Sequence, residues 1–280
     1  MKEKIKKIFK IIFLLAIIST IAMYWYDQYS YYFGGYSEYS TACPGYSNVA
    51  VIKIQGEIVT YGTELVDSEG SETTVSSDIA SSETIIGYLD EIEKADNIEA
   101  VIVEIDSYGG YPVASEEIMN ALKRMTKPTI AVIREGAASG AYLVASGADK
   151  IYASEMSDVG GIGITGSYLD YSQQNKKEGI IYQQLSSGKF KDTGDPDKVL
   201  TAAEKEFLMR DIKILHEAFV KRVAENRGLD IKKVEELADG STMLGQDAKE
   251  NGLIDEIGDI YDAQKWIKEE LKIEPEVCVY

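Results

Sequence analysis

The stretch PTIAVIREGAASGAY, residues 128–142, predicts a buried strand that runs directly into a sharp turn and a helix. Its first half is apolar and β-branched, which is typical of a strand covered on both faces. Its second half places Ser139 among glycines and alanines, and these small residues let other backbone and a substrate approach closely. The stretch therefore predicts a serine exposed at a strand-to-helix turn.

The same alternation of strand and helix continues on both sides of this stretch. Thr201, with Glu204 three residues later, forms a capping-box pattern, and Gly228 is placed to end the helix that follows. Buried strands that alternate with helices predict an α/β fold with a mostly parallel sheet and packing helices. We expect strands at 49–54, 100–105, 128–133, 151–153 and 180–185, and helices at 82–94, 112–124, 140–148, 201–226, 246–251 and 263–271, with a short helix capped by Asp230.

The first 26 residues predict a basic cytoplasmic segment followed by one transmembrane helix. Five lysines between residues 2 and 10 precede an apolar run at 11–23, and Tyr24, Trp25 and Tyr26 follow at once. A basic flank, an apolar stretch and an aromatic belt indicate a single spanning helix with a cytoplasmic N-terminus. A cleaved signal peptide is the alternative, but no small-x-small site follows the run. We expect an uncleaved single-pass anchor in the cell membrane and an extracytoplasmic remainder.

Composition narrows the class of protein further. Residues 27–47 are rich in Tyr, Ser and Gly and predict a juxtamembrane linker, and 60–82 predict a polar loop. A net charge of −18 repels phosphate backbones, which argues against nucleic acid as a partner. Cys43 and Cys278 form neither a CxxC motif nor a metal-ligand spacing. We expect two unpaired thiols, and one disulfide in an oxidising compartment is the alternative.

Two further segments carry residues suited to acyl-transfer chemistry. Asp106-Ser107-Tyr108-Gly109-Gly110 follows an expected strand, and paired glycines there allow a tight turn with N–H groups free for an oxyanion. The segment from Ser186 to Asp192 contains two lysines. A serine nucleophile needs a base, and the chain has one histidine, His216, so a neutral lysine is the expected base.

Together these motifs make the chain similar to the signal peptide peptidase A family, Ser/Lys endopeptidases of the Clp-protease/crotonase-like fold. The resemblance covers residues 48–272. It rests on five motifs in order: the Asp106–Gly110 turn, the Ala137–Tyr142 turn, Ala148–Ile151, Ser187–Asp192 and Gly252–Gly258. It implies a serine endopeptidase domain at 48–272, with a C-terminal tail at 273–280.

The resemblance also implies the role of each site residue. Ser139 would be the nucleophile and Lys191 the base, because the Lys-Asp register selects Lys191 over Lys189. Gly110 and Gly140 would supply oxyanion N–H groups. The family implies a homo-oligomeric ring in which neighbouring subunits share the dyad, with signal peptides or other hydrophobic peptide segments and membrane proteins as substrates. It implies no cofactor and no metal.

Some residues depart from the family pattern. Asp106 and Tyr108 stand where the family has Asn and Pro, and Gly161 stands where a serine commonly orients the lysine. Thr165, Ser187 or a water are the candidates to replace that serine. A catalytically weak or inactive membrane-associated scaffold of the same fold is therefore the alternative function.

Three other motifs suggest rival functions. Residues 161–166 spell GxGxxG, but no acidic residue follows at the spacing of a dinucleotide site. Residues 186–189 spell SxxK without the Ser-Asp-Asn or Lys-Thr-Gly of penicillin-binding enzymes. His216 could serve a Ser-His hydrolase, but it lies inside the expected helix at 201–226.

Overall fold

The computed structural model describes residues 43, 45–62, 65–66, 72–73 and 79–280. Eight strands within these ranges form one sheet in the order β10-β9-β7-β6-β1-β12, and β8 and β11 extend it because β8 also pairs with β7. Its strand pairs are parallel except β9 with β10, so the predicted α/β fold with a mostly parallel sheet is confirmed. The strands are β1 (Val49–Gln55), β6 (Ala100–Ser107), β7 (Thr129–Ala138), β8 (Lys150–Ala153), β9 (Asp158–Gly160), β10 (Thr242–Leu244), β11 (Glu256–Ile257) and β12 (Val277–Val279).

Strand β7 decides where the site forms. Residues 130–133 pair with β8, whereas 136–138 pair with β9, so the strand changes partners along its length. On its other side, Ser107 of β6 lies opposite Ala137. The carboxyl ends of parallel strands meet at one edge of a sheet. The segments that follow β6 and β7 are therefore neighbours.

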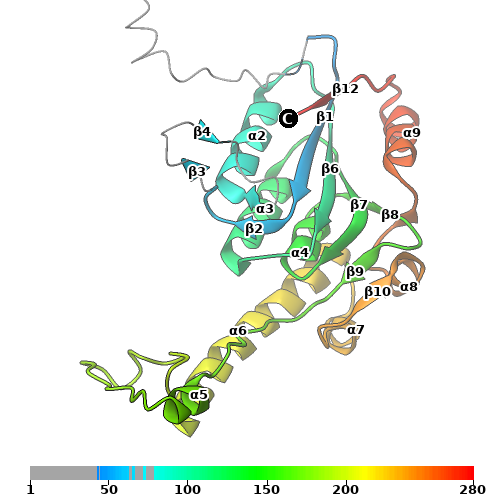
Figure 1. Ribbon diagram of the computed structural model, residues 1–280. Helices are drawn as coiled ribbons and strands as arrows, with labels where there is room; N and C mark the ends of the chain where they lie inside the picture. The colour runs from blue at the N-terminus through cyan, green and yellow to red at the C-terminus, as the bar shows by residue number, and fades with distance from the viewer. Residues whose placement is uncertain (1–42, 44, 63–64, 67–71, 74–78) are drawn as a thin grey trace, which may run out of the picture. The chain divides into compact units, whose positions relative to one another are not determined.

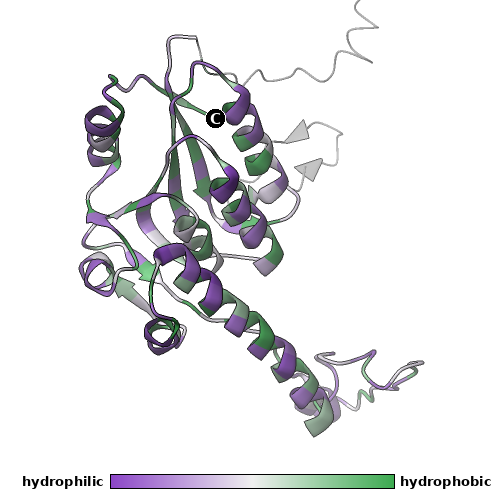
Figure 2. Ribbon diagram, turned by 180° about the vertical axis from the view of Figure 1, so that it is seen from behind, coloured by the Kyte–Doolittle hydropathy of each residue, from purple (hydrophilic) through white to green (hydrophobic). Residues whose placement is uncertain are grey.

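Helices cover both faces of the sheet. The larger core cluster packs α2 (Ser82–Lys94), α3 (Pro112–Arg124) and α4 (Gly140–Ser146) on one face, and a second cluster packs α9 (Ile260–Leu271) on the other (Figure 1). Figure 2 shows hydrophobic residues along the central strands, while the helices carry both kinds of residue. This burial on two faces explains the near-continuous apolar runs of β1, β6 and β7.

Helix α6 (Ala202–Arg227) has 26 residues and is about 39 Å long. Thr201 and Glu204 form the predicted capping box, and Gly228 ends the helix with a φ of 63°. Its C-terminal half packs into the core through Phe219, Val220, Val223 and Ala224, whereas its N-terminal half extends from the body beside α5 (Ser172–Lys177), as Figure 1 shows. We call the N-terminal half of α6, α5 and the loop at 178–201 the arm.

Short elements complete the chain. Helices α7 (Ile231–Leu237) and α8 (Gly245–Asn251) follow α6, and Asp230 caps α7 as predicted. Asp255, in the late motif, accepts hydrogen bonds from Arg227 and from the N–H of Ile151, which ties the end of α6 to β8. The polar stretch expected as a loop contains β3 (Leu65–Val66), β4 (Glu72–Thr73) and β5 (Ile79–Ser81), and β5 pairs with β2 (Glu57–Val59).

The strand expected at 180–185 is wrong. These residues have no strand partner and lie in the loop of the arm, where Ile181 and Leu185 are exposed. An apolar run needs a neighbouring strand to bond its backbone before it becomes part of a sheet. Here the run is an exposed apolar surface instead.

The expectation of free thiols is also wrong, because Cys43 and Cys278 form a disulfide with Cα atoms 5.6 Å apart. Residues 273–280, expected as a tail, contain β12, which pairs with β1 at the edge of the sheet. The N–H of Tyr280 also donates to the carbonyl oxygen of Val51. The disulfide thus fixes the start of the described domain to its last strand.

The expected anchor at 1–26 and most of the expected linker lie outside the described residues. Across the part of the chain that the structure describes, none of the helices has both the length and the apolar character of a membrane span.

Candidate active site

Ser139 occupies the junction between β7 and α4 with φ 53° and ψ −127°. Among the described non-glycine residues, only Ser139 and Lys272 have a positive φ. Such a conformation costs about 1–3 kcal/mol and persists where the surroundings enforce it. Here the N–H of Ser139 donates to Gly160 O at 2.8 Å, and Ser139 O accepts from the N–H of Leu143. The predicted exposed serine at a strand-to-helix turn therefore has the strained geometry of a nucleophile elbow.

The neighbours of Ser139 leave its hydroxyl free. Ala137, Ala138, Gly140 and Ala141 are buried, whereas Ser139 is half-buried. No described group forms a hydrogen bond with Ser139 Oγ. The hydroxyl is thus available to a base and a substrate from outside this chain segment.

The glycine turn after β6 packs directly on this serine. A Cβ on Gly109, whose φ is 102°, would lie 2.8 Å from Gly140 N and 3.0 Å from Ser139 Cβ. Ser107, which sequence analysis did not select, holds the turn: its Oγ accepts from the N–H of Gly109 and donates to Gly56 O. Because Gly56 is 51 residues away in the chain, no sequence pattern marked Ser107.

Gly110 and Gly140 both present unused N–H groups beside Ser139. In the parallel bridge to Ile58, the carbonyl of Gly109 accepts a hydrogen bond from Ile58 and the N–H of Tyr111 donates one to Ile58. The N–H of Gly110 takes no part in this bridge. Gly140 is the first residue of α4, so its N–H has no partner within that helix. A Cβ on Gly140 would lie 3.4 Å from Gly110 N. The N–H groups of the two predicted oxyanion donors are therefore neighbours, next to Ser139.

The departures from the family pattern surround the same turn. Gly161 has φ 58°, and a Cβ there would lie 3.1 Å from both Ser139 N and Ala138 Cβ. A serine at 161 would therefore be strained and crowded. Tyr108 is exposed, and its ring covers Gly136. Asp106 faces a different cavity, on the side of the sheet that α9 covers.

Lys191 lies far from Ser139 within one chain. Its neighbour Phe190 stacks on Phe207 of α6 with ring centroids 4.9 Å apart. Leu215, which lines the cavity next to Ser139, follows Phe207 by eight residues, about 12 Å of helix axis. Figure 1 shows this loop at the free end of α6, away from α4. One chain thus brings together Ser139, Gly110 and Gly140, but not Lys191.

The other residues named as candidates are also on the arm. The Lys189 ammonium lies 4.8 Å from the centre of the Phe190 ring, in the same loop as Lys191. Ser187 is exposed in the same loop, and Thr165 is exposed and hydrogen-bonded to Ser167. None of these side chains lines the cavity at Ser139.

Buried Glu204 holds the loop of Lys191 against α6. Its carboxylate accepts hydrogen bonds from Lys198, Thr201 and Thr193. The hydrogen bond from Lys198, followed by those from Thr201, lowers the pKa of Glu204 to about 2. The loop is therefore fixed to α6 by the Glu204 carboxylate, which stays charged at neutral pH.

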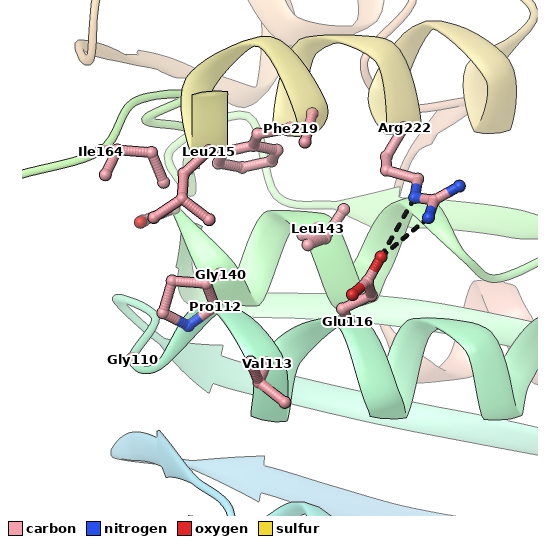
Figure 3. A pocket seen from close by; sticks show the side chains of 12 residues that line it. Gly110, Pro112, Val113, Glu116, Gly140, Leu143, Ile164, Leu215, Phe219 and Arg222 are labelled. Carbon is pink, nitrogen blue, oxygen red and sulfur yellow. Dashed lines mark hydrogen bonds and ion pairs between the residues drawn. The ribbon is translucent and has the colours of Figure 1, made fainter. Parts of the chain in front are cut away.

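An apolar cavity of about 110 Å³ opens beside Ser139 (Figure 3). It lies between α3, α4 and α6, and Glu116 and Arg222 form an ion pair at its far end. A cavity next to a nucleophile and oxyanion donors can hold the substrate side chain on the acyl side of a scissile bond. Its lining residues are Gly110, Pro112, Val113, Glu116, Ser139, Gly140, Leu143, Ile164, Leu215, Ala218, Phe219 and Arg222.

The rival motifs do not acquire the geometry that they need. Residues 161–166 open no helix, as a dinucleotide fingerprint must, and 186–189 lie in the loop of the arm. His216 is on α6 but does not line the cavity at Ser139. Within the described ranges, no group of three or more acidic, histidine or cysteine side chains could hold a metal ion.

Comparison with known proteins gives consistent matches. The model of peptidase family S49 matches residues 121–274, a range that includes Ser139, Gly140 and Lys191. A provisionally named protease of Methanocaldococcus jannaschii is 37% identical over 70% of this chain and 64% of its own length. A protein of Enterococcus faecium, provisionally named signal peptide peptidase SppA, is 32% identical over 82% of this chain and 66% of its own. Both matches span less than two thirds of the relative.

Among solved structures, a serine-to-alanine mutant of the 1510-N membrane-bound stomatin-specific protease matches with a TM-score of 0.49. That match has 20% sequence identity and covers 78% of this chain and 84% of the other.

Proposed function

The chain belongs to peptidase family S49, and we propose that it is a membrane-anchored serine endopeptidase that uses Ser139 and Lys191. The observation that carries the proposal is the strained Ser139 turn beside two unused glycine N–H groups and an apolar cavity. A free hydroxyl, oxyanion donors and a side-chain pocket are the parts that peptide hydrolysis needs on the nucleophile side.

The proposed reaction has two steps. Ser139 Oγ attacks the scissile carbonyl carbon while the neutral amine of Lys191 takes its proton, and the N–H groups of Gly110 and Gly140 stabilise the oxyanion. Lys191 then gives the proton to the leaving amine, which leaves an acyl ester on Ser139. Water attacks this ester, Lys191 takes a proton from the water and returns it to Ser139 Oγ as the acid leaves.

We propose that Lys191 acts on Ser139 of a neighbouring copy in a homo-oligomeric ring. The distance along α6 supports this, because one chain keeps its own Lys191 more than two helical turns from its own Ser139. Exposed apolar side chains on the arm, such as Ile181, Leu185 and Met209, are further support, since contact between copies would bury them.

The proposed substrates are signal peptides or other hydrophobic peptide segments, at the outer side of the cell membrane. The apolar cavity at Ser139 supports a hydrophobic substrate. The Cys43–Cys278 disulfide supports an extracytoplasmic domain, because disulfides form and persist in oxidising compartments.

One observation favours a second candidate, an inactive scaffold of the same fold. Gly161 removes the side chain that commonly orients the lysine in the family, and the nearby hydroxyl of Thr242 is hydrogen-bonded to Asp158. A scaffold would keep the fold and the apolar arm without turnover.

A serine-reactive fluorophosphonate probe separates the two candidates. Labelling of the full-length wild type, but not of Ser139→Ala, together with peptide cleavage that mass spectrometry detects, is the result expected of the endopeptidase. An intact oligomer in which Ser139 neither reacts nor cleaves would favour the scaffold.

A further inference from the structure

The cavity beside Ser139 ends at an ion pair that has no part in the proposed mechanism. Figure 3 shows Glu116 of α3 and Arg222 of α6 meeting across the cavity's far end. Nη2 and Nε of Arg222 lie 2.8 and 3.2 Å from the same oxygen, Glu116 Oε1. The pair therefore joins the two helices at this end of the cavity, and Asn226 of α6 also contacts Met119 and Lys123 of α3.

The pair lies about one helical turn from the reacting end. Gly110 precedes α3, and Glu116 follows Pro112 by four residues, about 6 Å along the helix. On the opposite wall, Leu215, Phe219 and Arg222 are spaced to share one face of α6. A substrate side chain that enters beside Ser139 reaches the pair if it is as long as lysine or arginine.

The walls between these two ends are apolar and close together. Figure 3 shows the side chains of Val113, Leu143 and Phe219 between the glycines and the pair. The cavity volume of about 110 Å³ is below the roughly 150 Å³ of a cavity that holds benzene. Its size favours aliphatic over aromatic side chains.

The two charges cancel where a long side chain would arrive. Each partner is 42% exposed, so water screens the pair, and its effect is smaller than that of a buried pair. Arg222 also has Glu225 3.8 Å away, on α6 and outside the cavity lining. A charged substrate side chain would lose hydration in the cavity without finding an unpaired partner.

We propose that Glu116 and Arg222 determine specificity: paired, they restrict the residue on the acyl side of the scissile bond to uncharged aliphatic side chains. This inference rests on the proposed function, because it assigns the cavity to the substrate of Ser139. Replacing one partner by a neutral residue removes its charge from the pair. The charge of the remaining partner then favours a substrate side chain of the opposite sign.

The test measures cleavage preference with the full-length protein and a synthetic peptide mixture that contains every residue type at each position. Mass spectrometry of the products gives the residue on the acyl side of each cut. In Arg222→Gln, cleavage after Lys and Arg should rise about fivefold relative to Leu. In Glu116→Gln, cleavage after Asp and Glu should rise by a smaller factor, because Glu225 remains 3.8 Å from Arg222. Peptidyl phosphonate probes that carry a Leu, Lys or Glu side chain should rank in the same way by labelling rate.

Two further variants control this test. Lys221→Gln removes a cation one residue away that pairs with Glu225 and does not line the cavity, so the preference should stay as in the wild type. The double variant Glu116→Arg with Arg222→Glu restores a pair of reversed polarity and should restore the aliphatic preference.

The outcomes separate this inference from the proposed function. If Ser139-dependent cleavage or labelling persists but both neutralised variants keep the wild-type preference, or both gain the same side chains, the inference is wrong and the peptidase proposal stands. If Ser139 of the wild type neither cleaves nor reacts with any probe, the peptidase proposal fails and the inference fails with it.

Discussion

Ser139 keeps a backbone conformation that favours glycine, although its side chain is not held by any described group. A structural serine in a strained turn would be expected to offset the strain with a side-chain hydrogen bond, as a helix cap does. Ser139 has no such bond, and the strain aims its hydroxyl at the cavity. The backbone strain at Ser139 therefore lowers the stability of the fold, while the hydroxyl remains free of hydrogen bonds within the described structure.

Replacing Ser139 should separate stability from activity. Ser139→Gly should be about 1 kcal/mol more stable than Ser139→Ala, because glycine relieves the positive φ and alanine does not. Both variants should lose peptide cleavage. Urea-induced unfolding of the two variants measures the difference in the free energy of unfolding. Equal stability would mean that the turn is not strained.

The placement of Ser139 beside Gly110 was predictable from the sequence for a geometric reason. The segments of Gly110 and Ser139 each follow a predicted strand, and neighbouring parallel strands end at the same edge of a sheet. Ser107 was not predicted, because its contact with Gly56 joins positions 51 residues apart and leaves no local pattern. The crowding that requires glycine at 161 was equally hidden, since it comes from Ala138 and Ser139 across the sheet.

At the scale of the elements, the arm gives the Lys191 loop a defined position without burying it. The Phe190–Phe207 stack and the contacts of Glu204 attach the loop to α6, while Lys191 itself is exposed. If Lys191 acts on a neighbouring copy, as proposed, it needs such a support, because a flexible loop would make the approach entropically costly.

Removing the charge of Glu204 should loosen this loop and slow turnover. In Glu204→Gln, hydrogen exchange of the loop should rise and kcat should fall about tenfold, with KM little changed, because the loop acts on the base and not on the substrate cavity. Glu206→Gln is the matched control, since Glu206 is exposed on the same helix. Equal kcat in the two variants would show that Glu204 does not position Lys191.

The same carboxylate gives a pH dependence of stability with a definite sign. The pKa of Glu204 is lowered from 4.5 to about 2, chiefly by the hydrogen bond from Lys198. A lowered folded-state pKa stabilises the fold above the unfolded-state value. The advantage of the wild type over Glu204→Gln in free energy of unfolding should therefore be constant above about pH 5 and shrink as the pH falls toward 2. An advantage that grows on acidification would contradict this assignment.

Helices were easier to predict than strands, because their signals are local. The capping box at Thr201 and the glycine at 228 set both ends of α6 from a few adjacent residues. Strands β9 to β12 have two or three residues each, and their pairing partners are distant in sequence. Conversely, a strand was predicted at 180–185 where none forms. This apolar stretch has no partner strand and remains an exposed surface of the arm.

At the scale of the whole molecule, the disulfide should stabilise the fold without serving the site. Cys43→Ser with Cys278→Ser should lower the free energy of unfolding by about 2–4 kcal/mol, because the bond closes most of the described chain into one loop. Activity should be retained at 25 °C, since β1 and β6 separate β12 from β7. Urea unfolding with and without a reductant measures the effect. Wild-type stability in the double variant would show that β12 holds its place without the bond.

The role of Lys191 could be inferred only from the family resemblance, and the single chain explains why. No pattern within one sequence reports that two residues meet across an interface. Within this chain the Lys191 loop lies beside the N-terminal half of α6, whereas the cavity at Ser139 lies beside its C-terminal half. Lys191→Ala should lower kcat about a thousandfold with the fold intact. Normal turnover in this variant would move the base to another group, with Lys189 the first candidate.

Co-expression of two inactive chains tests whether copies share the dyad. A chain with Ser139→Ala and a chain with Lys191→Ala each lack one half of every site. In a ring where each Ser139 meets the neighbour's Lys191, equal random mixing should restore about one quarter of wild-type activity, since one in four neighbouring pairs then holds both groups. Mixing Ser139→Ala with the double variant should restore none. If the first mixture also stays inactive while its chains assemble normally, the two groups must meet within one chain, which requires the arm to fold back along α6.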